Sequence, residues 1–499
     1  MEIRLKPARP LACVLLLIAG CSTVQQPTPR PGPSPTHLAI PRASVTPPQP
    51  PPTPSPAPNP WPALDRPLSA VGPWWVYNTP EGIWAVEADG SALALVLDRT
   101  PGTVERTFQF VPSPAGGLLA VIEIENIYER TPPQLYLLRL PDGEVTPVAQ
   151  LHPEGVDPSD AVAVDRWAAT GPRNSLAWSP DGSRLAFNAV IDGDTGDLYV
   201  YSLADGSLNR LTTGPTESAL PVWSPDGTRI VHASVERVYY EYSGRGYDYT
   251  GVWSAMADGS GVQLLSETRF YGFETVVGWL SDTAMLMDTE SIQENMACPL
   301  RDLRTFDLLT HRSTTLVQLR YSSRAYAPQN ATALLGVLAD PACEGGLAPG
   351  AYRVDARTGG PAEPVLEGDV IDLEWSAEAG QFFVWTAGRV VAIDLSSGAV
   401  LELVRPGQSS GLPIAAAGSR RLAWTGDEVW IGNLTDGTDY RAIKILDESA
   451  PVISWSPDGR NLLMMASSGL FVASEPEFTA HPVFFLTGFG TAWVLPPSN

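Results

Sequence analysis

Along residues 72–499, short apolar runs end at tight-turn signals and then begin again. Runs of this length, bounded by Gly, Pro, Asn or Asp, are typical of β-strands. The clearest unit is Trp-Ser-Pro-Asp-Gly, which occurs at 178–182, 223–227 and 455–459, each time between two apolar runs. The pattern therefore predicts strand, tight turn and strand, repeated along an all-β chain.

A second repeated feature is a hairpin in which an alternating strand runs into a turn, often Asp-Gly, as in 198–212. Related hairpins lie at 83–97, 135–149, 252–265, 303–317, 351–366, 390–404, 429–443 and, in degenerate form, 469–485. The first two Trp-Ser-Pro-Asp-Gly copies are 45 residues apart, which is the length of one four-stranded propeller blade. We therefore predict a single β-propeller of eight or nine four-stranded blades, with two smaller propellers as the alternative.

The first hairpin lacks a complete blade, because Trp74–Asn78 offers one preceding strand where two are needed. At the far end, residues 490–496 repeat the rhythm of Leu176–Pro180. A strand from one terminus that completes the blade of the other leaves no open sheet edge. We expect the propeller to span 72–499 and to be closed by the strand at 490–496.

The repeated pentapeptide resembles the TolB-like propeller repeat of bacterial envelope proteins. The resemblance covers most of residues 72–499 and is strict in the three copies above. It implies structural roles: Pro sets φ, Asp accepts backbone N–H bonds, Gly takes a positive φ, and Trp wedges between blades. We expect none of these residues to be catalytic.

The N-terminus has the pattern of an export signal. Basic residues in the first nine positions precede an apolar run at 11–20 that is too short to cross a bilayer. The run ends in Leu17–Cys21, which resembles a bacterial lipobox. That resemblance implies a lipoprotein signal peptide over 1–20 and an acylated, palmitate-bearing Cys21. The alternative is an ordinary secretory signal with a chance cysteine.

Residues 21–70 follow as a proline-rich segment, in which Pro, Ser, Thr and Ala dominate from 27 to 67. Without apolar periodicity it cannot bury enough surface to offset ordering, so we predict a disordered linker. Polyproline rises about 3.1 Å per residue, which makes the segment a tether of about 100 Å. The alternative is a ligand for proline-reading domains.

Charge and cysteine content agree with an exported protein. A net charge of −23 repels nucleic acid and anionic lipid head groups, so we expect no nucleic-acid partner and membrane attachment through the lipid alone. The predicted location is a bacterial membrane, on its extracytoplasmic side. Cys298 and Cys343 fall in equivalent loops of adjacent modules and are predicted to form a disulfide, with two unpaired thiols as the alternative.

Strands that alternate in direction place tight turns on one face of a propeller, and the longer connections of blades between about 100 and 350 on the other. Long loops on rigid scaffolds tend to carry function. The predicted partner-binding residues lie in one such loop and have the composition of a paratope: Tyr239, Tyr240, Tyr242, Arg245, Tyr247 and Tyr249. The alternative is that these tyrosines pack on the neighbouring blade.

Evidence for catalysis is weak. Four histidines of the predicted propeller, His152, His232, His311 and His481, fall in different modules without metal-ligand spacing. The acidic turn 192–197 lacks the bidentate Glu of a calcium loop, so no metal or other cofactor is expected. We predict a monomeric binding or scaffold module for an extracytoplasmic protein, peptide or glycan, without catalytic residues. The alternatives are a propeller lyase or hydrolase acting on an envelope or extracellular polymer, or a sensor ectodomain.

Overall fold

The computed structural model describes most of the predicted propeller. The described residues are 68–70, 72–79, 81–99, 106–125, 132–152, 176–193, 195–240, 244–267, 272–291, 300–338, 347–386, 389–403, 413–416, 420–425, 428–433, 441–443, 451–484 and 489–497. The predicted signal peptide, the acylation site Cys21, the linker up to residue 67, and the cysteines Cys298 and Cys343 lie outside them.

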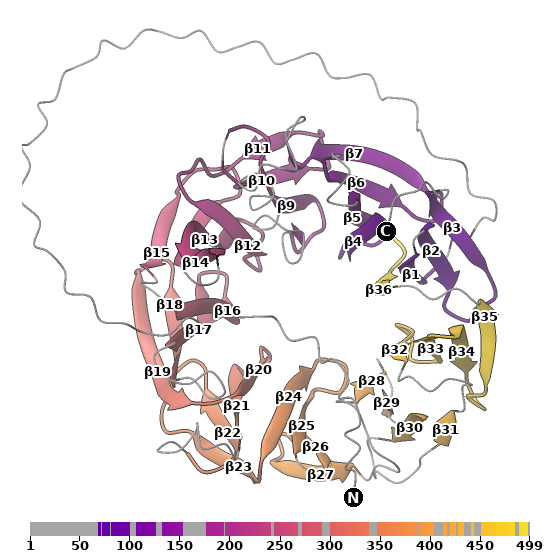
Figure 1. The fold of residues 1–499 in the computed structure, drawn as a ribbon. Helices are drawn as coiled ribbons and strands as arrows, with labels where there is room; N and C mark the ends of the chain where they lie inside the picture. Colours follow the sequence, from indigo (N-terminus) through magenta and orange to yellow (C-terminus); the bar gives the residue numbers. More distant parts are fainter. Residues whose placement is uncertain are drawn as a thin grey trace, which may run out of the picture. The chain divides into compact units, whose positions relative to one another are not determined.

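Nine four-stranded antiparallel sheets follow one another in a ring, with no helix among the described residues (Figure 1). The prediction of an all-β propeller is confirmed, at nine blades. We number the blades from the N-terminal side and list their strands from the inner strand outward.

The first blade is β36 (Phe489–Val494), β1 (Trp74–Thr79), β2 (Gly82–Glu87) and β3 (Leu93–Asp98). The second is β4 (Arg106–Pro112), β5 (Leu118–Glu125), β6 (Gln134–Arg139) and β7 (Glu144–Gln150). The third is β8 (Leu176–Trp178), β9 (Arg184–Ala189), β10 (Asp197–Ser202) and β11 (Leu208–Arg210). The fourth is β12 (Glu217–Trp223), β13 (Arg229–Tyr240), β14 (Gly244–Met256) and β15 (Gln263–Glu267). The fifth is β16 (Gly272–Ser281), β17 (Ala284–Ser291), β18 (Leu300–Asp307) and β19 (Arg312–Arg320).

The sixth blade is β20 (Ser323–Ala327), β21 (Thr332–Val337), β22 (Gly350–Asp355) and β23 (Glu363–Glu367). The seventh is β24 (Val370–Ser376), β25 (Gln381–Thr386), β26 (Val390–Asp394) and β27 (Ala399–Leu403). The eighth is β28 (Ile414–Ala415), β29 (Arg421–Thr425), β30 (Val429–Asn433) and β31 (Arg441–Ile443). The ninth is β32 (Val452–Trp455), β33 (Asn461–Ala466), β34 (Gly469–Ser474) and β35 (Ala480–Phe484).

The chain divides into two compact units. The larger unit, residues 61–236 and 247–499, contains the ring of blades. The smaller unit includes residues 237–246, from the hairpin of β13 and β14.

The Trp-Ser-Pro-Asp-Gly turn is held by its own side chains. In the first copy, Ser179 Oγ donates to Asp181 Oδ1 at 2.6 Å, the Ser183 N–H donates to the same oxygen at 3.0 Å, and the Arg184 N–H donates to Ser179 Oγ at 2.9 Å. Gly182 has a φ of 68°, a conformation that favours glycine. The hydrogen bonds from Ser179 and Ser183 lower the pKa of Asp181 to about 2. The motif is therefore a self-contained turn.

The tryptophan of each copy links neighbouring blades. Its indole Nε1 donates to a backbone carbonyl on the inner strand of the preceding blade, from Trp178 to Val111 at 3.0 Å, Trp223 to Ala177 at 2.8 Å and Trp455 to Ile414 at 3.2 Å. Each of the three indoles is also buried. A buried ring with a satisfied N–H stabilises the seam between two blades and leaves nothing for chemistry.

The ring closes through β36, which pairs antiparallel with β1, with Trp75 opposite Trp493 and Trp74 opposite Val494. The Gly117 N–H also donates to the Leu495 carbonyl at 2.6 Å, which connects the C-terminal strand to the second blade. Trp74 and Trp75 are completely buried by this arrangement. The two ends of the propeller therefore complete one blade together.

Candidate binding site

A hollow of 510 Å³ lies among the inner strands of four successive blades, the seventh, eighth, ninth and first. These strands, β24, β28, β32 and β36, line the inside of the ring (Figure 1). Most of the lining residues lie at or just after the C-terminal ends of β24, β32 and β36. On β24 and β32 these ends lead into the tight turns between first and second strands, so the hollow opens on the tight-turn face. Its size falls within the range of about 300–1,000 Å³ typical of small-ligand sites.

Aromatic and aliphatic side chains form most of the wall. Trp375, Trp455 and Trp493 come from three different inner strands. Ile414 lies on the inner strand of the eighth blade and Ile453 on the same strand as Trp455. Trp493 donates its Nε1–H to Ser454 Oγ at 2.8 Å, whereas the buried Nε1 of Trp375 has no hydrogen-bond partner among the described residues. Trp375 also packs on Phe382, with ring centroids 4.8 Å apart. The hollow is therefore an indole-rich surface with one unused donor.

Two carboxylates complete the lining, Glu374 at the end of β24 and Glu378 in the turn that follows. Desolvation raises the pKa of Glu374, and the negative charges of Asp372 and Glu378 raise it further. Among the described residues that line the hollow there is no Lys, Arg or His. Its electrostatic character is therefore negative without a compensating cation.

The residues of this hollow were missed by the sequence reasoning, although a signal for them was present. Trp375-Ser376 begins a degenerate copy of the pentapeptide, in which Glu378 replaces the turn aspartate; Ser376 Oγ donates to Glu378 at 3.3 Å. Trp493 stands in the closing strand. The tryptophans were assigned to seams between blades, but Trp375 and Trp493 are only partly buried and line an open surface.

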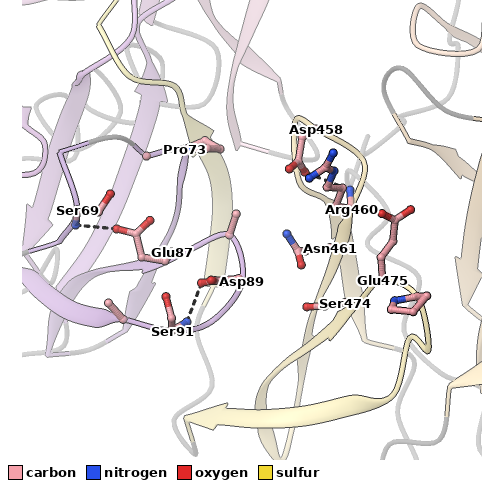
Figure 2. A pocket seen from close by; sticks show the side chains of 14 residues that line it. Ser69, Pro73, Glu87, Asp89, Ser91, Asp458, Arg460, Asn461, Ser474 and Glu475 are labelled. Atoms are coloured by element: carbon pink, nitrogen blue, oxygen red, sulfur yellow. Dashed lines mark hydrogen bonds between the residues drawn. The ribbon is translucent and has the colours of Figure 1, made fainter.

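A second, larger hollow of 780 Å³ separates the first and ninth blades on the same tight-turn face. Figure 2 shows Glu87 and Asp89 on one side of this groove and Asp458, Arg460 and Glu475 on the other. The carboxylates already have partners: Glu87 accepts from the Ser69 N–H (2.8 Å) and Trp74 Nε1 (3.2 Å), Asp89 from the Ser91 N–H (2.9 Å), Asp458 from the Arg460 N–H (3.1 Å), and Glu475 pairs with Arg421. The groove is polar, and its acidic side chains are already engaged in hydrogen bonds and an ion pair within the protein.

Away from the two hollows, buried ion pairs join second strands of two blades to neighbouring segments. The completely buried Asp288 side chain lies 2.8 Å from both Arg301 Nη1 and Arg324 Nε, and accepts from the Tyr321 hydroxyl at 2.7 Å. A similar cluster joins Glu123 to Arg99, with donor–acceptor distances of 2.5 and 2.7 Å. These ion pairs connect the fifth blade to the sixth and the first blade to the second. Because the charges neutralise one another, we interpret them as stabilising contacts between blades.

The predicted tyrosine loop is a ribbon of two strands, since β13 runs to Tyr240 and β14 begins at Gly244. β13 and β14 therefore contain most of the residues that were predicted as a loop. The side chains of Tyr239, Tyr240, Arg245 and Tyr247, and all of Tyr242, lie outside the described set. Tyr249 is half-buried, and burial raises its pKa.

The described residues contain no cluster of His, Cys, Asp and Glu suited to a metal ion. His152, His232 and His481 belong to the second, fourth and ninth blades, and His311 to a turn of the fifth. One Gly-x-Ser-x-Gly spacing occurs, at 407–411, outside the described residues. Where the chain is described, no helix is present to form the strand-to-helix elbow of serine hydrolases, and none has the length and hydropathy to cross a bilayer.

Comparison with known proteins shows the fold and no closer kinship. No protein-family model matches the chain. A segment of 63 residues is 43% identical to the uncharacterized peptidase YuxL of Bacillus subtilis (strain 168), but it covers 13% of this chain and only 9% of that protein's length.

Among solved structures, a eukaryotic initiation factor is similar over 86% of this chain and 100% of its own, with 14% identity and a TM-score of 0.52. TolB from Acinetobacter baumannii matches 57% of this chain and 61% of its own, at 15% identity and a TM-score of 0.30. An oligogalacturonate lyase in complex with manganese matches 74% and 97%, at 14% identity and a TM-score of 0.40. The likeness to the initiation factor agrees with the β-propeller fold of this chain.

Proposed function

We propose that this chain is an extracytoplasmic binding module of the TolB-like kind, and that the indole-rich hollow is its ligand site. In this proposal acylated Cys21 holds the protein at a bacterial membrane, and the proline-rich segment up to residue 70 carries the monomeric propeller away from it. The partner is an extracytoplasmic protein, peptide or glycan.

The observation that carries the proposal is the lining of the hollow. The partly buried Trp375 and Trp493, together with Ile414 and Ile453, form an open apolar surface with a few polar groups among them, which is the composition of recognition sites. Trp is also among the residue types most enriched at binding hot spots. No histidine or metal cluster accompanies these residues where the structure describes the chain, so the arrangement favours recognition over turnover.

The tyrosine ribbon at 239–249 is a second contact surface in this proposal, based on its local density of tyrosine. The two surfaces can be tested separately. The hollow is formed by inner strands on the tight-turn face, whereas the ribbon is formed by the second and third strands of the fourth blade.

The test is capture of envelope material by the tethered propeller, with a glycan array in parallel. Trp375→Ala with Trp493→Ala should abolish capture, whereas Trp84→Ala, another partly buried tryptophan outside the hollow, should leave it intact. Replacing Tyr240, Tyr242 and Tyr247 by Ala tests the ribbon in the same assay. Capture that survives both sets of substitutions, with the variants folded, would overturn the proposal.

Hydrolysis or lyase chemistry is the second candidate, and the paired carboxylates favour it. Raised pKa values suit a carboxyl group to act as a general acid, and Glu374 has such a shift beside Glu378. Product analysis on any captured polymer decides between the two functions. Turnover that Glu374→Gln removes without loss of binding would establish an enzyme.

A further inference from the structure

The indole-rich hollow combines two features that are not needed together for a neutral ligand. Its wall contains Trp375, Trp455 and Trp493, and its polar lining contains the uncompensated carboxylates Glu374 and Glu378. Aromatic faces attract cations through the ring quadrupole, most strongly for tryptophan. Carboxylates attract the same charge, and Glu374 and Glu378 are both exposed at the hollow.

We propose that the hollow recognises an alkylammonium group, a quaternary or protonated amine carried on a small apolar body. The inference rests on the proposed binding function and names the chemical group that this site takes. Methyl or methylene groups of such a cation would contact Ile414 and Ile453, and the positive charge would lie among the indoles and the two carboxylates.

The negative charge of the lining disfavours anionic and neutral ligands. An anionic ligand would meet two negative side chains and no cation among the described lining residues, on a chain with a net charge of −23. A neutral sugar would stack on the indoles but would gain nothing from the charge of the two exposed carboxylates. A cation relieves the repulsion among Glu374, Asp372 and Glu378 that already raises the pKa of Glu374.

The other three strands around the hollow add no competing charge. The lining residues of β28 and β32 are Ile414, Ala415, Ile453, Ser454 and Trp455, and those of β36 and the residue after it are Trp493 and Leu495. The negative charge is therefore concentrated on the seventh blade, opposite aromatic side chains of the ninth and first. A ligand with one charged end and apolar surroundings matches that distribution.

The experiment compares two isosteric probes on the full mature protein. Choline chloride and its neutral isostere 3,3-dimethyl-1-butanol are titrated at constant ionic strength, with tryptophan fluorescence and calorimetry as readouts. Choline should bind saturably and about tenfold or more tightly than the neutral compound. Equal affinities, or no saturable choline binding up to tens of millimolar, would overturn the inference.

Variants test the two halves of the site. Glu374→Gln with Glu378→Gln should reduce choline affinity about tenfold and leave the neutral isostere unchanged. Trp493→Ala should weaken both probes. Glu402→Gln, an exposed carboxylate on the outer strand of the same blade, should alter neither. Loss of choline binding in the Glu402 control would show that general charge, and not this hollow, attracts the cation.

Failure of this inference is distinguishable from failure of the binding function. If the hollow variants abolish capture of the envelope partner but choline neither binds nor competes, the site binds and the alkylammonium assignment is wrong. If capture persists in the folded Trp375 and Trp493 variant, the hollow is not the binding surface at all.

Discussion

His232 makes folding depend on pH in a way that can be measured. The ring lies in β13, is 3% exposed, and has Nδ1 3.2 Å from the carbonyl oxygen of Ala233, to which it donates. Its Nε2 is buried without a hydrogen-bond partner among the described residues. Burial therefore penalises the charged imidazolium and lowers the pKa of His232 to about 4.

The direction of the pH dependence follows from the protonation of His232 in the folded and unfolded states. The unfolded chain has a histidine pKa near 6.5, so it binds a proton at a pH where the folded ring remains neutral. Stability is therefore complete above pH 6.5, falls as the pH drops from 6.5 to about 4, and levels off below. Linkage gives a cost of about 2 kcal/mol at pH 5, since each pKa unit corresponds to about 1.36 kcal/mol.

The assay is urea unfolding of the wild type and His232→Leu at pH 7 and pH 5. The variant loses the bond to Ala233 at both values, which costs about 1 kcal/mol and does not change with pH. The wild type should lose about 2 kcal/mol more than the variant between the two pH values. His481→Leu is the control, because that ring is exposed.

Parallel behaviour of the wild type and His232→Leu between pH 7 and pH 5 would refute the reasoning. It would mean that the buried ring accepts a proton in the folded protein, through a partner or through opening of the fourth blade. If His481→Leu removes the pH dependence instead, His481 and not His232 is the group that titrates.

Three further predictions concern the anchor, the cysteines and closure. Cys21→Ser should move the protein from the membrane to the soluble fraction, and a variant that stays with membranes contradicts acylation. Non-reducing peptide mapping of the exported protein should find Cys298 linked to Cys343, whereas complete alkylation of both thiols without reductant would exclude the bridge. Deleting residues 489–499 removes the ladder to β1 and the buried Val494, worth about 5 kcal/mol together, so an unchanged melting temperature would contradict closure through β36.

The fold was predictable because its information is local and repeated. Ser179, Asp181 and Gly182 each satisfy a requirement of the turn itself, so the pentapeptide specifies strand, turn and strand wherever it occurs. The rhythm of 490–496 marks a strand of the same kind as Leu176–Trp178, and the structure pairs it with β1. Because the units repeat, the sequence predicted the number of blades to within one.

The site was not predictable because it depends on which equivalent residues stay exposed. Trp178 and Trp375 occupy matching positions in their blades, yet Trp178 is buried with its N–H bonded to Val111 and Trp375 lines an open hollow. The buried Nε1 of Trp375 has no hydrogen-bond partner among the described residues, unlike that of Trp178. No local pattern in the sequence records this difference.

If the hollow is the ligand site, closure and recognition are coupled in this propeller through the C-terminal strand. Trp493 pairs with Trp75 in the ladder that closes the ring, and the same residue lines the hollow with Trp375 and Trp455. The complete hollow therefore exists only while β36 is in place. A ligand that binds this closed form and not the open one must stabilise closure, by about 2.7 kcal/mol at a concentration one hundred times its Kd. Binding at the hollow should thus raise the stability of the seam between the first and ninth blades.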